Sequence, residues 1–334
     1  MGNRTSRKAC SPTLSPRAEI GQSKAAVVGR RCQQINPTMR VHVLVGRVED
    51  LPIDAFENVD LVIVATDNLA AELDVNRRCR QLGQPLFRAA LHGETQTVQV
   101  FAHGNVGEDS PCVGCGYVRE EWELLSQQIQ FPCAGSASAD ARVLAQPTRS
   151  VPSLCALAAD LALNQVLRHV LKLGGAVADT ALEFCGLSNR TVTSPLKRNA
   201  NCPCDHRRYT FRAPLDRLSQ MSPAALAVAA GFREGAGFAA FSLDGFAWVR
   251  LGACGCAAPR SVNRFVSAAQ PQAGICPACR SPIRVAPFYR ERAVSSWTLG
   301  SLAEQPFESL GAAAVRYAIV DDGKHAVVFR ASGS

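Results

Sequence analysis

Apolar and polar residues follow one another in blocks that predict alternating strands and helices. Residues 60–65 form an almost unbroken apolar run rich in valine and isoleucine, which is typical of a strand buried on both faces of a sheet. The run stops at Thr66-Asp67-Asn68, and residues 69–82 then carry apolar side chains at helical spacing. Alternation over residues 41–48 predicts a further strand.

The same pattern continues on both sides of this centre. A helical pattern opens at Gly21-Gln-Ser-Lys24 and is stopped by Asn36-Pro37. Residues 86–91 and 95–101 predict two strands, and a long helix is expected over 153–173. This order predicts an α/β fold with a doubly wound sheet.

The character of the chain changes near residue 208. Beyond it we expect a small helical patch at 224–231, a strand at 246–251 and a β-hairpin within 314–329. We therefore predict two domains, 1–208 and 209–334, the second rich in short strands.

The polar triplet at the end of the central strand is the first candidate site. Ligands of open α/β sheets bind beyond the carboxyl ends of strands, where Asp67 could hold Mg²⁺ and orient a phosphate. Alternatively, Asp67 or Asn68 is only the N-cap of the following helix. The pattern leaves both interpretations open.

Composition narrows the class of protein. The formal net charge of +8 is modest, the basic residues are spread along the chain, and aromatic residues make up only 6%, so no nucleic-acid partner is expected. No apolar run reaches membrane-spanning length, because 154–173 contains Asp160 and Arg168. Since the N-terminus has no apolar core of a secretory signal, a cytoplasmic protein without a membrane partner is expected.

Eight of the fourteen cysteines fall into four close pairs. In a reducing compartment such pairs are zinc ligands rather than disulfides. Cys254/Cys256 and Cys276/Cys279 have the separation of a zinc ribbon, which would staple a small β domain over about 245–290. The other two pairs are Cys112/Cys115 and Cys202/Cys204.

The order of the motifs resembles the ThiF/MoeB/HesA adenylyltransferases, the bacterial relatives of ubiquitin-activating enzymes. The resemblance covers about residues 20–205. It rests on these stretches: Gly21-Gln-Ser-Lys24-Ala, Ile35-Asn-Pro37, Asp60 to Asn68, Asn76-Arg-Arg-Cys79, Gly83-Gln-Pro-Leu86 and Pro111-Cys-Val-Gly-Cys115.

The resemblance implies a Rossmann-like sheet that binds ATP and Mg²⁺ and adenylates the C-terminal glycine of a ubiquitin-like or sulfur-carrier protein ending in Gly-Gly. By motif, Lys24 would contact the phosphates, and Asp67, beside Asn68, would serve the Mg²⁺ and the reacting phosphate. A fixed cation and a metal ion offset the repulsion between an attacking carboxylate and a phosphate. Lys24 could instead be a solvated lysine of the first helical turn.

The family's glycine-rich phosphate loop and ribose-binding acidic residue precede the matched segment, so the fold expected is an N-terminally truncated Rossmann-like sheet. Asn3 with Arg7 is the nearest match to the family's Asn-x-x-Arg element, one residue longer. The resemblance also implies one structural zinc site built from both cysteine pairs of the first domain, where His206 could replace Cys204 because Cys-Pro-Cys is shorter than Cys-x-x-Cys. Cys133 corresponds in position to a cysteine that accepts the activated carrier in some members; otherwise it is an inert thiol.

Two functional hypotheses follow. The first is an adenylyltransferase that works with ATP, Mg²⁺ and two structural Zn²⁺ ions. The second is a non-catalytic, zinc-stapled scaffold that binds the carrier or a catalytic homologue. The resemblance implies a homodimer or heterodimer in either case. A zinc-ribbon nucleic-acid binder over residues 240–334 is a third class, against which the lack of a dense basic stripe counts.

Overall fold

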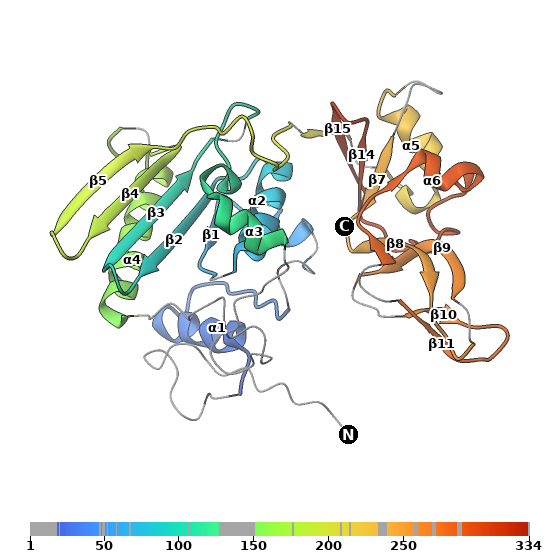
Figure 1. Cartoon of the computed structure of the whole chain (residues 1–334), viewed down its shortest axis with the longest axis horizontal. Coiled ribbons are helices and arrows are strands. Elements are labelled where there is room, and N and C mark those ends of the chain that lie inside the picture. The colour runs from blue at the N-terminus through green and yellow to red at the C-terminus, as the bar shows by residue number, and fades with distance from the viewer. Residues whose placement is uncertain are drawn as a thin grey trace. The chain divides into compact units, whose positions relative to one another are not determined.

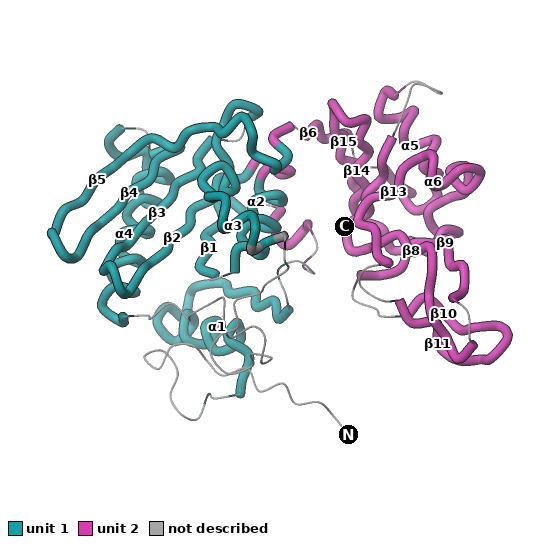
Figure 2. The backbone as a smooth tube through the Cα atoms, viewed as in Figure 1, with its two compact units in different colours: residues 1–49, 59–79, 84–205 teal, residues 50–58, 80–83, 206–334 magenta. Residues whose placement is uncertain are grey.

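The computed structural model describes most of the chain and divides it into two compact units. The described residues are 19, 21–46, 48, 51, 53–57, 59–66, 68–105, 107–126, 151–175, 177–207, 209–213, 215–232, 239–256, 259–268, 272–285 and 289–332. The first unit comprises residues 1–49, 59–79 and 84–205, and the second comprises 50–58, 80–83 and 206–334 (Figure 2).

A five-stranded mixed sheet forms the centre of the first unit, in the order β1-β2-β3-β4-β5 (Figure 1). Only β1 and β2 pair in parallel, and the other neighbours are antiparallel. The strands are β1 (Val62–Val64), β2 (Leu86–His92), β3 (Thr97–His103), β4 (Thr180–Cys185) and β5 (Arg190–Pro195).

Helix α4 (Pro152–Val170) covers one face of β2 and β3 (Figure 1). Its buried Leu154 and Ala158 pack with Val98, and its Val166 packs with the fully buried Phe87. The other helical elements of this unit are α1 (Lys24–Ile35), α2 (Leu69–Leu82), the 3-10 turn η4 (Val113–Gly116) and α3 (Arg119–Ser126). The last turn of α2 is assigned to the second unit.

Three sequence predictions need correction here. Residues 41–46 form no strand, because Val41 and Val43 lie against Gly29 of α1 rather than along a sheet edge. The central strand is shorter than 60–65 and is not buried on both faces, since Ile63 is 52% exposed. Among the described residues the sheet contains one parallel pair and is mixed rather than doubly wound.

The described residues of the second unit form three sheets. One has five strands in the order β13-β7-β14-β15-β6, one has the order β12-β8-β9, and one is the hairpin β10-β11. Their bounds are β6 (Tyr209–Phe211), β7 (Ala240–Leu243), β8 (Phe246–Gly252), β9 (Arg260–Ser267), β10 (Gln272–Ile275), β11 (Pro282–Arg284), β12 (Arg290–Glu291), β13 (Val294–Ser295), β14 (Tyr317–Asp321) and β15 (Ala326–Arg330). The predicted C-terminal hairpin is confirmed by the antiparallel pair β14 and β15.

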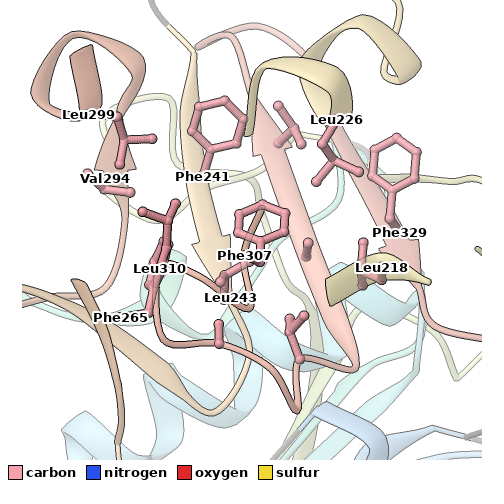
Figure 3. Packing of buried hydrophobic residues seen from close by; sticks show 14 of the residues in the cluster. Leu218, Leu226, Phe241, Leu243, Phe265, Val294, Leu299, Phe307, Leu310 and Phe329 are labelled. Carbon is pink, nitrogen blue, oxygen red and sulfur yellow. The ribbon is translucent and has the colours of Figure 1, made fainter. Parts of the chain in front are cut away.

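One large apolar core holds this unit together. Phe241, Phe265 and Phe307 are almost fully buried in it, and Leu226 contributes from the helix α5 (Figure 3). The remaining helical elements are η3 (Ile53–Phe56), η6 (Leu218–Gln220), α5 (Pro223–Ala229), α6 (Ser296–Leu299) and η8 (Gly300–Glu304).

Residues 50–58 belong to the second unit although they are distant from it in sequence. Ile53 packs with Tyr317 and Val328, and its backbone N–H donates to the carboxylate of Asp244 at 2.6 Å. Glu57 accepts hydrogen bonds from the Tyr317 hydroxyl and, at 2.6 Å, from Arg330. Within the described part of the chain, no helix has both the length and the apolar character needed to cross a bilayer.

Candidate functional site

The end of β1 leads into α2 through a capped turn. The side-chain oxygen of Asn68 accepts a hydrogen bond from the backbone N–H of Ala71 at 3.1 Å, so Asn68 caps the helix. Asp67, Cys133, Asn3 and Arg7 lie outside the described residues. The structure therefore shows the capping role for Asn68, and the binding role of Asp67 remains a prediction.

Lys24 is the first residue of α1 and is exposed. The helix begins there because the Ser23 hydroxyl caps it, accepting from Ala26 N–H at 3.5 Å. The helix dipole does not stabilise a cation at this N-terminal position. The exposed position is compatible with both interpretations of Lys24, a solvated lysine and a phosphate ligand.

The cysteines of the first unit converge on one point. The Sγ atoms of Cys112, Cys115 and Cys202 all lie within 4.8 Å of one another, and those of Cys112 and Cys202 are 3.7 Å apart. Zinc–sulfur bonds of about 2.3 Å in a tetrahedron place neighbouring sulfurs about 3.8 Å apart. The spacing therefore fits zinc, and it is too long for disulfides.

Cys204 is a candidate fourth ligand of this group from the same unit. Its sulfur lies beside Gly114 of η4, and its hydrogen bond with the Cys112 thiol raises the pKa of Cys112, as burial also does. Burial raises the pKa of Cys202 to about 12. A cation among these sulfurs would favour their thiolate forms. His206 could take the place of Cys204 as the fourth ligand. It is assigned to the second unit, whose long segment, residues 206–334, begins with it.

Backbone geometry prepares the first cysteine group. The backbone N–H of Cys115 donates to the Cys112 carbonyl at 3.0 Å, which closes the tight turn η4. The Cys115 sulfur accepts from the backbone N–H of Asn199 at 3.4 Å and from Arg198 at 3.8 Å. Such N–H donors stabilise negative charge on sulfur and orient the ligand.

A buried polar network connects the turn η4 with its flanking Cys112, here called the knuckle, to α2. Asn76 accepts the backbone N–H of Val113 at 3.2 Å, and the Tyr117 hydroxyl donates to Glu72 at 2.8 Å. Glu72 also pairs with Arg88, whose guanidinium lies 4.2 Å from the centre of the Phe101 ring. The sequence analysis did not single out Glu72, Arg88 or Tyr117; the available signal was the charge of Arg88 inside the largely apolar strand β2.

The second cysteine group lies in the second unit. The Sγ atoms of Cys254, Cys256, Cys276 and Cys279 lie within 4.8 Å of one another, and those of Cys256 and Cys276 are 3.9 Å apart. Again the edge length matches a zinc tetrahedron. The backbone N–H of Ser281 holds the pKa of Cys279 down at about 6, which favours a thiolate ligand. The four predicted ribbon cysteines are thus brought together.

Comparison with known proteins gives the family. The model of the ThiF family matches residues 13–204, more than half of the sequence. The chain therefore belongs to the ThiF family.

Two characterised relatives show the range of the similarity. The chain is 29% identical over 187 residues to the sulfur carrier protein adenylyltransferase of Thermus thermophilus, which is 55% of this chain and 63% of that protein. It is 36% identical over 90 residues to ubiquitin-activating enzyme E1 1 of Arabidopsis thaliana, 25% of this chain and 8% of that protein. The chain thus spans less than two thirds of either relative's length.

Solved structures of low sequence identity also match. The structure of E. coli MccB with succinimide is 16% identical, covers 57% of this chain and 52% of that chain, and has a TM-score of 0.42.

Proposed function

We propose that this protein adenylates the C-terminal glycine carboxylate of a ubiquitin-like or sulfur-carrier protein, using ATP and Mg²⁺. The observation that carries the proposal is the ThiF match over residues 13–204, supported by the relative named as a sulfur carrier protein adenylyltransferase. The polar triplet at 66–68 follows a parallel strand, the position at which α/β sheets bind ligands.

Each candidate residue has a chemical task in this proposal. Asp67 holds the Mg²⁺ beside the reacting phosphate, and Lys24 places a cation near the phosphates. Asn3 and Arg7 are proposed as further nucleotide contacts. The metal ion, when bound, reduces the repulsion between the carboxylate and the α-phosphate. Cys133 is proposed to accept the activated carrier as a thioester, with AMP as the leaving group.

Zinc is proposed at both cysteine groups as a structural ion. The donors are four sulfurs in the second group, and in the first group three sulfurs with Cys204 or His206 as the fourth donor. A closed tetrahedral set of such donors leaves no position for a reacting water. The ions would therefore fix the fold and take no part in the chemistry.

The second candidate function is a non-catalytic subunit that holds the carrier or a catalytic homologue in a heterodimer. The helix-capping hydrogen bond of Asn68 favours this function, because its side-chain oxygen accepts from Ala71 N–H and is thereby occupied by a structural role. For the first candidate function, adenylation, we propose that the chain acts as a dimer.

The mass of the carrier distinguishes the two candidates. The zinc-loaded chain is mixed with ATP, Mg²⁺ and a carrier ending in Gly-Gly, and the intact carrier is weighed. The adenylation proposal predicts an added AMP on this carrier and none on a carrier lacking the final glycine. A carrier that binds but gains AMP only when a second ThiF-family protein is present would establish the scaffold role instead.

A further inference from the structure

The zinc ribbon is a strongly basic part of the chain. Residues 246–295 contain seven arginines, no lysine and a single acidic residue, Glu291, which gives a net charge of +6. The whole chain has a formal net charge of +8, and residues 1–48, with nine basic residues and one acidic residue, form another basic stretch. The arginines are Arg250, Arg260, Arg264, Arg280, Arg284, Arg290 and Arg292, and all but Arg260 and Arg290 are exposed.

Three of these arginines come from separate segments whose backbones or side chains contact the cysteine group or its flanking residues. Arg260 on β9 donates to the Cys256 sulfur at 3.5 Å, and Arg280 directly follows Cys279. Arg284 on β11 pairs through its backbone with Ala253, the residue before Cys254, at 2.7 and 2.8 Å. The fold therefore brings three arginine-bearing segments, which the sequence separates, to one cysteine group.

Neutralising the metal site does not account for this charge. A zinc ion with four thiolates is an anion, and the Arg260 hydrogen bond offsets part of that charge at the sulfur. Arg280 and Arg284 are exposed to solvent. Electrostatic attraction to the metal site is weak at exposed positions, so it does not explain why these two residues are arginines. Such guanidinium groups match phosphate in geometry and charge.

A hollow of about 390 Å³ lies on the neighbouring strands β8, β9 and β12. It is lined by Arg250, Leu251, Ser261, Asn263, Tyr289 and Glu291. An aromatic ring beside hydroxyl and amide groups suits the face and edge of a nucleobase. Since a base can enter such a hollow only when it is unstacked, the shape favours a single strand over a duplex.

We propose that the arginine patch of the zinc ribbon, Arg260, Arg280 and Arg284, binds the phosphate backbone of single-stranded nucleic acid. This function is additional to the carrier adenylation proposed above and does not depend on it. The expectation of no nucleic-acid partner rested on the spread of basic residues over the whole chain and on the low aromatic content, and it did not consider how the segments of 246–295 come together.

The test is binding of a fluorescent single strand of about 16 nucleotides, the upper end of the site size of one single-strand-binding OB fold. RNA, DNA and a duplex are compared by anisotropy with the full zinc-loaded chain at several salt concentrations. The R280Q/R284Q variant is expected to bind the single strand at least about tenfold more weakly. Its log–log salt slope should fall by about 1.4, the value for two lost phosphate contacts.

The control is R119Q/R190Q, which removes the same charge from exposed positions of the first unit. It should bind like the wild type, and R280K/R284K should retain most of the affinity because charge is kept. Zinc content and melting temperature verify that every variant is folded.

Three results would overturn the proposal: no binding of either single strand at low salt, equal loss in both glutamine variants, or tighter binding of the duplex. Displacement of the RNA by polyglutamate at lower concentration than by unlabelled RNA would also overturn it, and would assign the patch to an acidic protein.

Discussion

Gly114 and Cys204 lie so close together that a Cβ atom added to Gly114 would meet the Cys204 sulfur at 2.5 Å. The ring of Trp122 blocks the same space at 3.0 Å. Glycine is therefore required inside the turn η4 by the packing of the fourth cysteine. This contact links the fold of the knuckle to its proposed metal ion.

Replacing Gly114 by alanine should displace Cys204 and weaken the first metal site. The G114A protein is expected to release one zinc ion per chain to a chelator faster than the wild type, by at least about tenfold, the loss typical of a disturbed metal environment. G116A is the matched control, because a Cβ at Gly116 meets nothing within 4 Å. Equal release from both variants would remove Cys204 from the ligand set and favour His206.

Loss of a ribbon cysteine should unfold only the end of the second unit. Structural zinc in small domains contributes about 10–16 kcal/mol of binding free energy, which here would hold β10 and β11 to β8 and β9. C276S should therefore contain one zinc per chain in place of two and show faster hydrogen exchange over residues 246–285. C185S, a substitution at the half-buried last residue of β4, should keep both ions. Two ions in C276S would contradict the site.

Breaking the Glu72–Arg88 pair should destabilise the first unit. Glu72 is 7% exposed, so E72Q leaves the Arg88 charge buried without its partner. A cost of about 3–5 kcal/mol is expected for such a change. Urea unfolding measures it, with E123Q as the control, because the Arg119–Glu123 pair is exposed and its loss should cost less than about 1 kcal/mol. A cost below 1 kcal/mol for E72Q would show that the pair does not support the knuckle.

The hydrogen bonds of Glu57 make the second unit depend on pH. Burial by itself raises the pKa of Glu57, but hydrogen bonds from Tyr317 and Arg330 outweigh it and lower the pKa below the ordinary 4.5. The unfolded chain therefore takes up the proton at a higher pH than the folded chain does. The stabilisation is present above pH 4.5 and is lost as pH falls through the lowered pKa.

The E57Q variant tests this dependence. Its free energy of unfolding should lie below that of the wild type at pH 7, and the difference should shrink as pH falls below 4.5. E304Q, at an exposed position, should match the wild type throughout. A difference that is the same at pH 7 and pH 3 would mean that Glu57 acts through packing rather than charge.

The sequence predicted those parts of the fold that depend on local pattern. The long helix α4 and the hairpin β14–β15 have strong periodicity and clear turn signals, and both are present. The second strand of the β4–β5 hairpin was missed because Arg190–Pro195 is exposed throughout and has no apolar face. A strand was wrongly predicted at 41–48, where the apolar side chains pack on α1.

Long-range contacts were beyond the reach of local pattern. Nothing in residues 50–58 indicates that Ile53 and Glu57 join the second unit, because their partners lie at Asp244 and Tyr317. The cysteine spacing, in contrast, predicted the second candidate metal group, and the family resemblance implied that Cys112 and Cys115 join Cys202 in the first. The arginine patch escaped notice because Arg260 reaches the Cys256 sulfur, in the cysteine group that Arg280 adjoins, only after the ribbon has formed.

The most direct measurement of the central claim is carrier-dependent exchange of pyrophosphate into ATP by the purified, zinc-loaded chain with Mg²⁺. We predict exchange that requires a carrier ending in Gly-Gly and that falls by at least about a hundredfold in D67A, as expected when a group stabilising the transition state is lost. D60A, at an exposed position on the same segment, should retain exchange. Undiminished exchange in D67A would remove Asp67 from the site. No exchange by a folded wild type that binds the carrier would contradict the adenylation proposal and leave the scaffold role.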